Sequence, residues 1–206
     1  MTGTAEPPSL DLEQIVETLD RYGVAYLLVG GSAARLYGAS RLTRDVDCLV
    51  SRGAANLKCL GAAMRELGAR LRVEGMSDED ARSLPAPLDP VSLGRLQIST
   101  WRTDAGDIDI LVDIPGRDGH GLGFEDLIER AKETTVGHAK ILVADLGDII
   151  ASKEWANRPK DQEALPELRR LAADSNGAGQ GPPSSDRPYP PAAPPPEDGR
   201  RTRPPL

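Results

Sequence analysis

The sequence predicts an α/β (α+β) fold, in which amphipathic helices alternate with short apolar strands. Three observations favour this fold class. Residues 11–23 carry Leu12, Ile15, Val16 and Leu19 at helical spacing, and residues 24–31 follow as an apolar strand. Two further strands flank the turn DAGD, which is typical of a hairpin. Residues 174–206 hold ten of the 18 prolines and few core-forming residues, so we expect a disordered tail there.

The other elements follow from the same patterns, in chain order. One or two helical turns are expected over 32–38, a strand over 43–51 and a helix over 54–71. Residues 75–90 are polar and Pro-rich, so we expect mostly loop. The hairpin strands cover 96–103 and 107–114, and a helix is expected over 123–134. The last elements are a hairpin over 135–144, around Gly137, and two helices over 145–157 and 160–173.

This order divides the chain into a flexible leader over 1–10, a domain over 11–173 with closing helices from about 145, and a disordered tail over 174–206.

Composition limits the class of protein. The chain has 206 residues, enough for one domain with appendages, and 39% hydrophobic and 28% charged residues suit a soluble globular protein. There is no apolar run of about 18 residues and no basic or apolar start typical of a secretory signal, so a cytoplasmic location away from the membrane is expected. Cys48 and Cys59 are expected to be reduced. The net charge of −7 means that a nucleic-acid partner would need a local basic patch, for which the candidates are Arg158, Lys160, Arg169 and Arg170.

Two aspartates stand one residue apart in an apolar strand, in the segment DVDC. Asp45 and Asp47 would point to the same side of the strand, with Val46 and Cys48 on the other side. Neighbouring carboxylates repel, and burial raises that cost, whereas a divalent cation removes it. A third ligand is expected from the segment GDIDILVDI. We favour Asp109, in the middle of that strand, over Asp107.

A glycine pair precedes these acids. Gly30 and Gly31 end the first strand, and Ser32 begins the next helical turn. Glycines allow the backbone to approach a phosphate closely, and a helix start offers free N–H groups. Gly-Gly-Ser is common in turns, so the indication of a phosphate-binding site comes from its spacing to the two aspartates.

The segments VGGS and DVDC together resemble the signature of the nucleotidyltransferase superfamily. The fuller pattern, GG-x-A followed by a Gly and R-x-T-x-D-x-D, is similar to that of the AbiEii-type nucleotidyltransferases of toxin–antitoxin pairs. The closing segment SKEWANRPKDQEALPEL is similar to that group's lysine followed by R-x-K-D. The resemblance spans about residues 11–172, and Cys48 departs from it where Leu is usual.

The resemblance implies a strongly twisted mixed sheet flanked by helices, and an Mg²⁺-dependent transfer of a nucleotide from a nucleoside triphosphate to an acceptor hydroxyl. It implies two Mg²⁺ ions, a tRNA 3′ end or a protein as acceptor, and a cognate antitoxin as partner. The catalytic residues would be Asp45, Asp47, Asp109 and Lys153, the three aspartates also holding the metal ions. The nucleotide-binding residues would be Gly30, Gly31, Ser32, Arg41 and Lys160.

Other readings stay open. A small-molecule nucleotidyltransferase, such as one acting on an aminoglycoside, would need an acidic acceptor pocket, which SDED at 77–80 would provide. A non-catalytic nucleotide- or partner-binding relative would use the Pro-rich tail as a docking arm. A purely structural account pairs Asp47 with Arg41 or Arg44.

Several residues with reactive or aromatic side chains are expected to be structural. Asp113 precedes a turn, and both tryptophans, Trp101 and Trp155, have the positions of core residues. His120 and His138 lack the spacing of metal ligands.

Overall fold

The protein is described by a computed structural model that covers residues 9–72, 76–84 and 86–177. The predicted leader lies almost wholly outside these ranges, as does most of the predicted tail, and the division into domains stays a prediction. In this part of the chain, no helix combines the length and the apolar character needed to cross a membrane.

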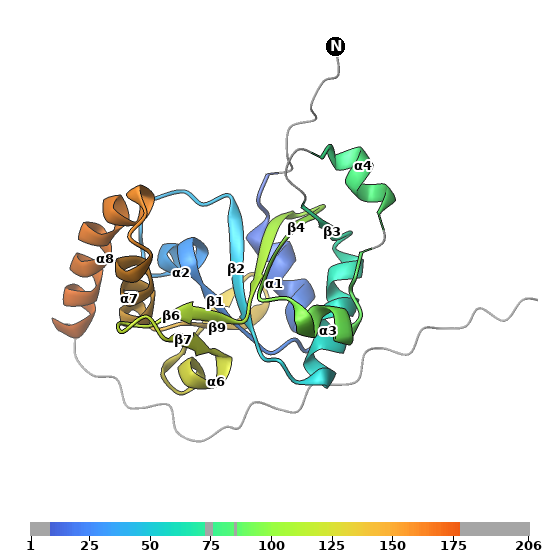
Figure 1. The fold of residues 1–206 in the computed structure, drawn as a ribbon. Helices are drawn as coiled ribbons and strands as arrows, with labels where there is room; N and C mark the ends of the chain where they lie inside the picture. Colours follow the sequence, from blue (N-terminus) through green and yellow to red (C-terminus); the bar gives the residue numbers. More distant parts are fainter. Residues whose placement is uncertain (1–8, 73–75, 85, 178–206) are drawn as a thin grey trace, which may run out of the picture.

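The main sheet has seven strands in the order β3-β4-β5-β2-β1-β9-β8 (Figure 1). Its strands are β1 (Tyr26–Val29), β2 (Asp45–Val50), β3 (Arg70–Leu71), β4 (Ile98–Thr103), β5 (Gly106–Leu111), β8 (Lys132–Val136) and β9 (Ala139–Val143). The β2–β5 and β1–β9 pairs are parallel and the others antiparallel, so the sheet is mixed. A separate hairpin joins β6 (Asp113–Pro115) to β7 (Gly121–Gly123).

Helices flank the sheet, with α2, α7 and α8 to the left of β2 in Figure 1 and α1 and α3 to its right. The helices are α1 (Leu12–Arg21), α2 (Gly30–Leu36), α3 (Ala54–Glu66), α4 (Asp78–Ser83), α5 (Pro90–Arg95), α6 (Phe124–Leu127) with the 3₁₀ turn η1 (Ile128–Arg130), α7 (Leu146–Ala156) and α8 (Pro159–Gly177). The predicted fold class, a mixed sheet flanked by helices and followed by C-terminal helices, is confirmed.

Local sequence explains where α1 begins and ends. The Asp11 carboxylate accepts a hydrogen bond from the backbone N–H of Gln14, which caps the helix start. Ile15, Val16 and Leu19 are buried on one face. Gly23 then adopts a positive φ of 64°, which lets the chain turn into β1.

The structure departs from the predicted secondary structure at two places. Residues 75–90, expected to be mostly loop, contain the short helix α4, and α5 begins at the last residue of this segment; Ser77 and Asp89 accept hydrogen bonds from the backbone N–H groups that follow them and so cap these helices. The helix expected over 123–134 ends early. From Lys132 the chain pairs with β9 instead, since a ladder with five residue pairs satisfies more backbone groups than an isolated helical turn.

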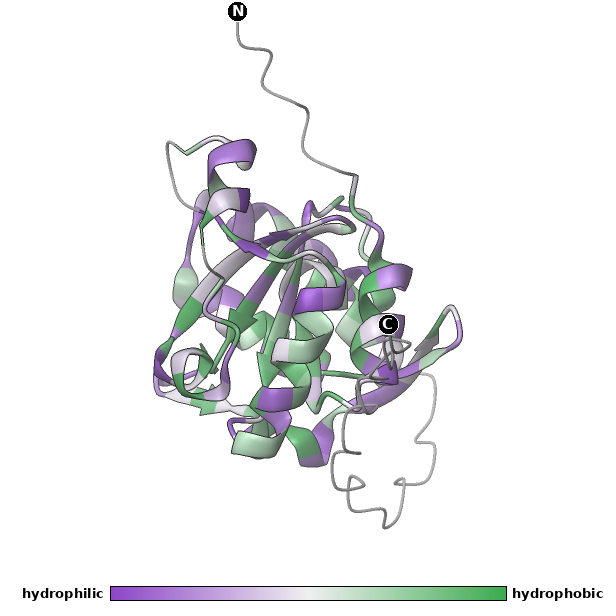
Figure 2. Ribbon diagram, turned by 90° about the vertical axis from the view of Figure 1, so that its right-hand side faces the viewer, coloured by the Kyte–Doolittle hydropathy of each residue, from purple (hydrophilic) through white to green (hydrophobic). Residues whose placement is uncertain are grey.

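The core lies between the sheet and its helices, where hydrophobic residues concentrate in Figure 2. Its largest fully buried side chains include Trp101, Leu49 and Ile108. Cys48 and Cys59 are buried and pack as small apolar residues. This rigid centre positions the acidic ends of β2 and β5.

Candidate active site

The parallel pair β2–β5 brings four carboxylates to one face of the sheet. In the pairing register, Asp45 lies opposite Asp107 and Asp47 lies opposite Asp109. The alternate positions, Val46, Cys48, Ile108 and Ile110, are buried. The prediction that Asp45 and Asp47 share a side, with Val46 and Cys48 on the other, is therefore confirmed, and Asp109 comes to the same place from a strand about sixty residues away.

Asp107 and Asp109 have different surroundings. The Asp107 carboxylate forms ion pairs with Arg102 (Nε–Oδ1 2.9 Å) and Arg72 (Nη1–Oδ2 3.2 Å). Asp109 has a hydrogen bond from the Thr100 side chain, but its Oδ1 atom is buried without a hydrogen-bond partner among the described residues. A buried carboxylate oxygen without a donor is costly, so this atom is suited to a cation. These contacts favour Asp109 over Asp107 as the third acid.

Burial and mutual repulsion act on the acidic face. Burial, with the nearby charges of Asp45 and Asp109, raises the pKa of Asp47 to about 6. Burial also raises the pKa of Asp109, and the charge of Asp45 adds to the effect. Such clusters are expensive to keep for structure alone, so the acidic face is a candidate for chemistry.

The glycine pair lies directly against this face. Gly30 has a positive φ of 61°, and a Cβ atom placed on it would lie 1.9 Å from Asp47 Oδ2. The backbone N–H of Gly31 donates to the same oxygen atom at 3.3 Å. Only glycine fits at position 30, because both the backbone conformation and the neighbouring carboxylate exclude a side chain.

Ser32 and Thr43 hold Asp45 from two sides. The Ser32 hydroxyl is buried and donates to the Asp45 carbonyl oxygen at 2.8 Å. The Thr43 hydroxyl donates to Asp45 Oδ1 at 2.8 Å. The sequence analysis did not single out Thr43 as a contact of Asp45. Its position two residues before Asp45, in T-x-D-x-D, was the signal for a contact with the carboxylate.

The junction of α7 and α8 places two cations near the acids. Asp161, on α8, is fully buried and accepts hydrogen bonds from Lys153 Nζ (3.2 Å) and Arg158 Nε (2.6 Å). Burial acts to raise the pKa of Asp161, but the hydrogen bonds from Arg158 and Lys153 outweigh it and hold that pKa below its usual value. The charge of Lys153 lowers the pKa of Asp47, and the charges of Asp47 and Asp45 contribute to the raised pKa of Arg158. The sequence analysis missed Arg158 as a residue of the site.

The other two predicted nucleotide contacts lie at the surface. Arg41 pairs with Glu163 (Nη1–Oε2 2.7 Å), so the structural account in which it pairs with Asp47 is not observed. Lys160 is exposed in the first turn of α8. Their roles stay predictions.

Metal binding also stays a prediction. Across the described ranges, no group of three or more His, Cys, Asp or Glu side chains is arranged to hold a metal ion as it stands. The Thr43 hydroxyl holds Asp45 on one side, and Asp47 and Asp109 repel each other. The unpartnered Oδ1 atom of Asp109 nevertheless fits a cation, since carboxylate oxygens are the ligands that Mg²⁺ prefers.

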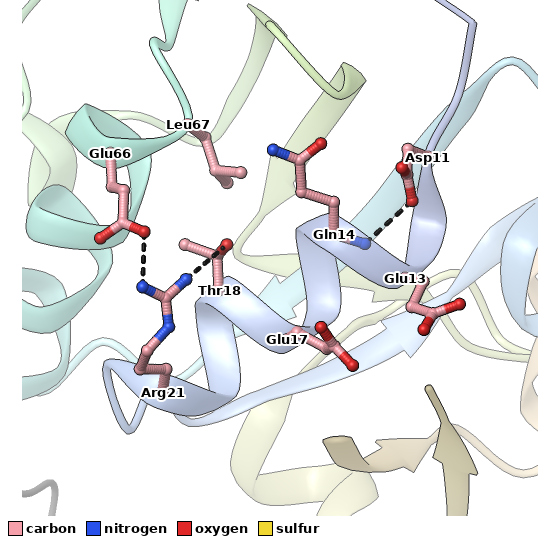
Figure 3. A pocket seen from close by; sticks show the side chains of 8 residues that line it. All are labelled: Asp11, Glu13, Gln14, Glu17, Thr18, Arg21, Glu66 and Leu67. Atoms are coloured by element: carbon pink, nitrogen blue, oxygen red, sulfur yellow. Dashed lines mark hydrogen bonds and ion pairs between the residues drawn. The ribbon is translucent and has the colours of Figure 1, made fainter. Parts of the chain in front are cut away.

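A hollow of about 420 Å³ lies elsewhere, beside α1 and the end of α3 (Figure 3). Its polar groups bond to one another: the Arg21 guanidinium donates to Glu66 and Thr18, and the backbone N–H of Gln14 donates to the Asp11 carboxylate. None of its lining residues comes from β2, β5, α7 or α8. The hollow therefore does not belong to the acidic face.

The remaining candidates are the two tryptophans, the acidic segment 77–80 and the two histidines. Trp101 is fully buried, as expected, but the core prediction was wrong for Trp155, which is 55% exposed. Residues 77–80 lie at the start of α4, where the Ser77 hydroxyl donates to Asp80 at 2.6 Å. His120 pairs with Asp118 (Nδ1–Oδ2 3.0 Å), and the backbone N–H of His138 donates to Glu17.

The chain matches one protein-family model and no curated protein. A family model described as the nucleotidyl transferase AbiEii toxin of a type IV toxin–antitoxin system matches residues 15–169. A search of curated proteins found no match.

A search of solved structures found matches of low sequence identity. The lincomycin-bound lincosamide antibiotic adenylyltransferase LnuA is 14% identical with a TM-score of 0.50, over 79% of this chain and 99% of that one. ANT(2″)-Ia in complex with adenylyl-2″-tobramycin is 17% identical with a TM-score of 0.49, over 81% and 88% of the two chains. JHP933 from Helicobacter pylori is 15% identical with a TM-score of 0.39, over 79% and 68%.

Proposed function

The chain belongs to the AbiEii nucleotidyltransferase family, and from this premise we propose that it transfers a nucleoside monophosphate from a triphosphate to an acceptor hydroxyl at the acidic face of β2 and β5. The observation that carries the proposal is the pairing of Asp47 with Asp109 next to Gly30, opposite two cations held by Asp161. The proposal therefore assigns the acids to one end of the reaction and the cations to the other.

The metal-binding residues in this proposal are Asp45, Asp47 and Asp109, which would hold two Mg²⁺ ions. Bound Mg²⁺ would supply positive charge to the triphosphate and to the attacking oxygen. The raised pKa of Asp47 and the unpartnered Oδ1 atom of Asp109 support this assignment, because both indicate an acidic face that lacks compensating charge.

The side chains would divide the chemistry between them. Asp109 accepts the proton of the acceptor hydroxyl, and burial, which raises its pKa, makes it a stronger base than an exposed aspartate. The acceptor oxygen then forms a bond to the α-phosphorus, and the bond from that phosphorus to the bridging oxygen breaks. Pyrophosphate leaves with the electron pair. Lys153 and Arg158 stabilise the charge that develops on the phosphate oxygens.

The triphosphate would lie along the start of α2. Gly30, Gly31 and Ser32 are the proposed contacts, with Arg41 and Lys160 closing the site from the surface. The contact between Gly30 and the Asp47 carboxylate supports this role, because the start of α2 lies directly beside the acids. The Gly31 N–H donates to Asp47 and the Ser32 hydroxyl donates to Asp45, so in this proposal a bound triphosphate would replace these contacts.

The proposed acceptor is an RNA end, with a protein hydroxyl as the second choice. Arg41, Arg44, Arg158 and Lys160 are exposed, and all lie close in sequence to the acids or to Lys153. A polyanion suits this rim better than a cationic drug does. The family also implies an antitoxin partner, so we propose that the chain is the toxin of a pair.

A small-molecule acceptor is the second candidate. The fold likeness to a lincosamide adenylyltransferase is the observation in its favour. The acidic segment 77–80, which that reading uses as an acceptor pocket, lies on α4 near β3, at the edge of the sheet. A non-catalytic relative is the third candidate, and the free Oδ1 atom of Asp109 argues against it.

A transfer assay tests the proposal. The full chain is incubated with Mg²⁺ and each of four labelled nucleoside triphosphates, in separate arms with total RNA, with cell protein and with a lincosamide or an aminoglycoside. The Asp47→Asn variant is the control. Label on RNA that requires Asp47 supports the proposal.

Label on the drug alone would replace the RNA acceptor by the second candidate. No transfer in any arm, with an intact and folded chain, would overturn the proposed activity.

A further inference from the structure

The face of the sheet that carries the acids continues across β4 and β3 as a row of arginines. In the antiparallel register Arg102, on β4, lies opposite Asp107, and Arg70, on β3, lies opposite Arg102. Residues opposite each other in a ladder point to the same face of the sheet. The backbone N–H of Arg72, directly after β3, donates to the Thr100 carbonyl oxygen at 2.9 Å and continues this ladder. Three arginines therefore follow the acids toward the edge of the sheet.

A hollow of about 30 Å³ lies between these strands and α4, and Arg70, Arg72 and Arg102 all line it. Ser77 and Ala81 line its other side, and Figure 1 shows α4 beside β3 at the edge of the sheet. Of the described residues that line the hollow, none is acidic. Guanidinium groups bind phosphate oxygens through paired, charge-assisted hydrogen bonds, so the lining of this hollow favours a phosphate group.

The contacts of the three arginines single out Arg72 as the group that can turn to a ligand. Arg102 holds both oxygen atoms of Asp107 (Nε–Oδ1 2.9 Å and Nη2–Oδ2 3.3 Å), and Arg70 pairs with Asp104 (Nη1–Oδ1 3.2 Å). Arg72 reaches the same Asp107 carboxylate (Nη1–Oδ2 3.2 Å), and 56% of its side chain is exposed. Because Arg102 already compensates the charge of Asp107, Arg72 can bind an anion without leaving that acid unpaired.

The hollow lies on the opposite side of the acids from the cations proposed for the triphosphate. Burial raises the pKa of Asp109, and the charge of Arg72 acts against this shift. The charge of Lys153 acts in the same way on Asp47, the partner of Asp109 in the β2–β5 register. In Figure 1, α7 and α8 lie to one side of β2, and β3 and β4 lie to the other. Arg72 is therefore placed beyond Asp109, on the side left for the acceptor.

We propose that the hollow lined by Arg70, Arg72 and Arg102 binds a backbone phosphate of a single-stranded RNA acceptor, close to the end that reacts at Asp109. The inference rests on the proposed function, since it names a contact for the acceptor of that site. Arg72 and Asp109 are two strand spacings apart, about 10 Å, so the phosphate belongs to a nucleotide near the reacting hydroxyl. A phosphate contact positions the RNA and reads no base.

Binding measurements test the hollow without any transfer. A labelled single-stranded oligoribonucleotide of about 8 nucleotides is titrated with the full chain at several salt concentrations, in the absence of triphosphate. Arg72→Gln is expected to weaken binding about 3- to 10-fold, equally for oligoribonucleotides of different sequence. It should also reduce the slope of log K against log salt by about 0.7, the value for one lost phosphate contact with a single strand. Arg72→Lys keeps the charge and should keep the slope.

Two further variants control for charge and for folding. Arg21→Gln is the matched control, because 58% of the Arg21 side chain is exposed and it also pairs with one carboxylate, that of Glu66 on α3. It should change neither the RNA affinity nor the salt slope. Asp107→Asn removes the carboxylate that competes with a phosphate for Arg72, so it should tighten RNA binding. Melting curves of each variant identify any that fail to fold.

In the transfer assay, Arg72→Gln should raise KM for the RNA acceptor and leave KM for the triphosphate unchanged. A rise in KM for the triphosphate alone would assign the hollow to the triphosphate and overturn the proposal. Unchanged RNA affinity and salt slope in Arg72→Gln would also overturn it, while the proposed transfer stood. Transfer to a drug alone, with no RNA binding by the wild type, would overturn both the role of the hollow and the proposed acceptor.

Discussion

Ionisation of Asp47 destabilises the folded protein. Burial and its acidic neighbours raise its pKa from 3.8 to about 6, so the folded state resists ionisation of this group more than the unfolded state does. The free energy of unfolding therefore falls as the pH rises from about 4 to about 6. At about 1.4 kcal/mol per pKa unit, the loss is on the order of 2–3 kcal/mol.

The Asp47→Asn variant should consequently be more stable than the metal-free wild type at neutral pH, by roughly 4–10 °C in Tm. The gain should shrink below pH 6 and vanish near about pH 3, below the unfolded value of 3.8, where Asp47 is largely protonated in both states. Thermal unfolding in the presence of a chelator, followed from about pH 3 to about pH 8, measures it. A constant difference across that range would show that Asp47 does not carry the effect.

Gly30 is the residue at which a single methyl group should abolish activity. An alanine Cβ would lie 1.9 Å from Asp47 Oδ2 in a backbone conformation with φ of 61°, so the carboxylate must move. We expect Gly30→Ala to reduce nucleotide transfer at least about 100-fold, since small misplacements at a reacting centre have effects of that size. Gly53→Ala is the control, because nothing lies within 4 Å of a Cβ atom there.

Asp107 and Asp109 lie two residues apart on β5, and their substitution should affect activity and stability differently. Asp109→Asn is expected to abolish transfer with little loss of Tm, because Asp109 faces the site with an unpartnered oxygen. Asp107→Asn is expected to keep most of the activity and to lower Tm, because it breaks the contacts with Arg102 and Arg72. Transfer rates and melting curves of the two variants decide the matter, and the reverse pattern would make Asp107 the third acid.

At the scale of elements, Asp161 on α8 joins two segments: it bonds to Lys153 on α7 and to Arg158 in the junction between α7 and α8. Removing its charge would leave Lys153 without its partner, and breaking a buried ion pair costs about 3–5 kcal/mol. We expect Asp161→Asn to lower Tm and to slow transfer together. Glu154→Gln, which breaks only the exposed pair with Arg169, should do neither. A normal rate in Asp161→Asn would show that Lys153 does not need to be held.

Elements that depend on local signals were predictable from sequence, and those that depend on distant partners were less so. The cap at Asp11 and the turn at Gly137 defined α1 and the β8–β9 hairpin. In contrast, the residues from Lys132 carry no local mark that separates the end of a helix from the start of an edge strand. These residues form a strand because they pair with β9, which lies later in the chain.

The candidate site follows the same rule. The shared side of Asp45 and Asp47 comes from strand alternation, so sequence alone could predict it. That Arg102 and Arg72 occupy Asp107 depends on side chains from β4 and the residue after β3, which only the fold brings together. The exposure of Trp155 was likewise invisible, because its helical spacing is that of a core residue.

At the scale of the whole molecule, binding of Mg²⁺ and nucleotide should offset the electrostatic repulsion among the aspartates of β2 and β5. Mg²⁺ with a non-hydrolysable triphosphate at about 100 times its Kd should stabilise the wild type by about 2.7 kcal/mol, or roughly 5–10 °C in Tm. The Asp47→Asn, Asp109→Asn double variant should show less than about 1 °C. An equal shift in both proteins would place the nucleotide away from these acids.

The register of β2 with β5 has a consequence for the newly made chain. Asp47 leaves the ribosome long before Asp109, and Lys153 and Asp161 follow later still. During synthesis, proteins emerge from the N-terminus, so the early segments wait for their distant partners. On the proposed roles of Lys153 and Asp161, an unfinished polypeptide that stops before Asp161 is expected to be inactive, so activity would first arise after the α7–α8 junction has been made.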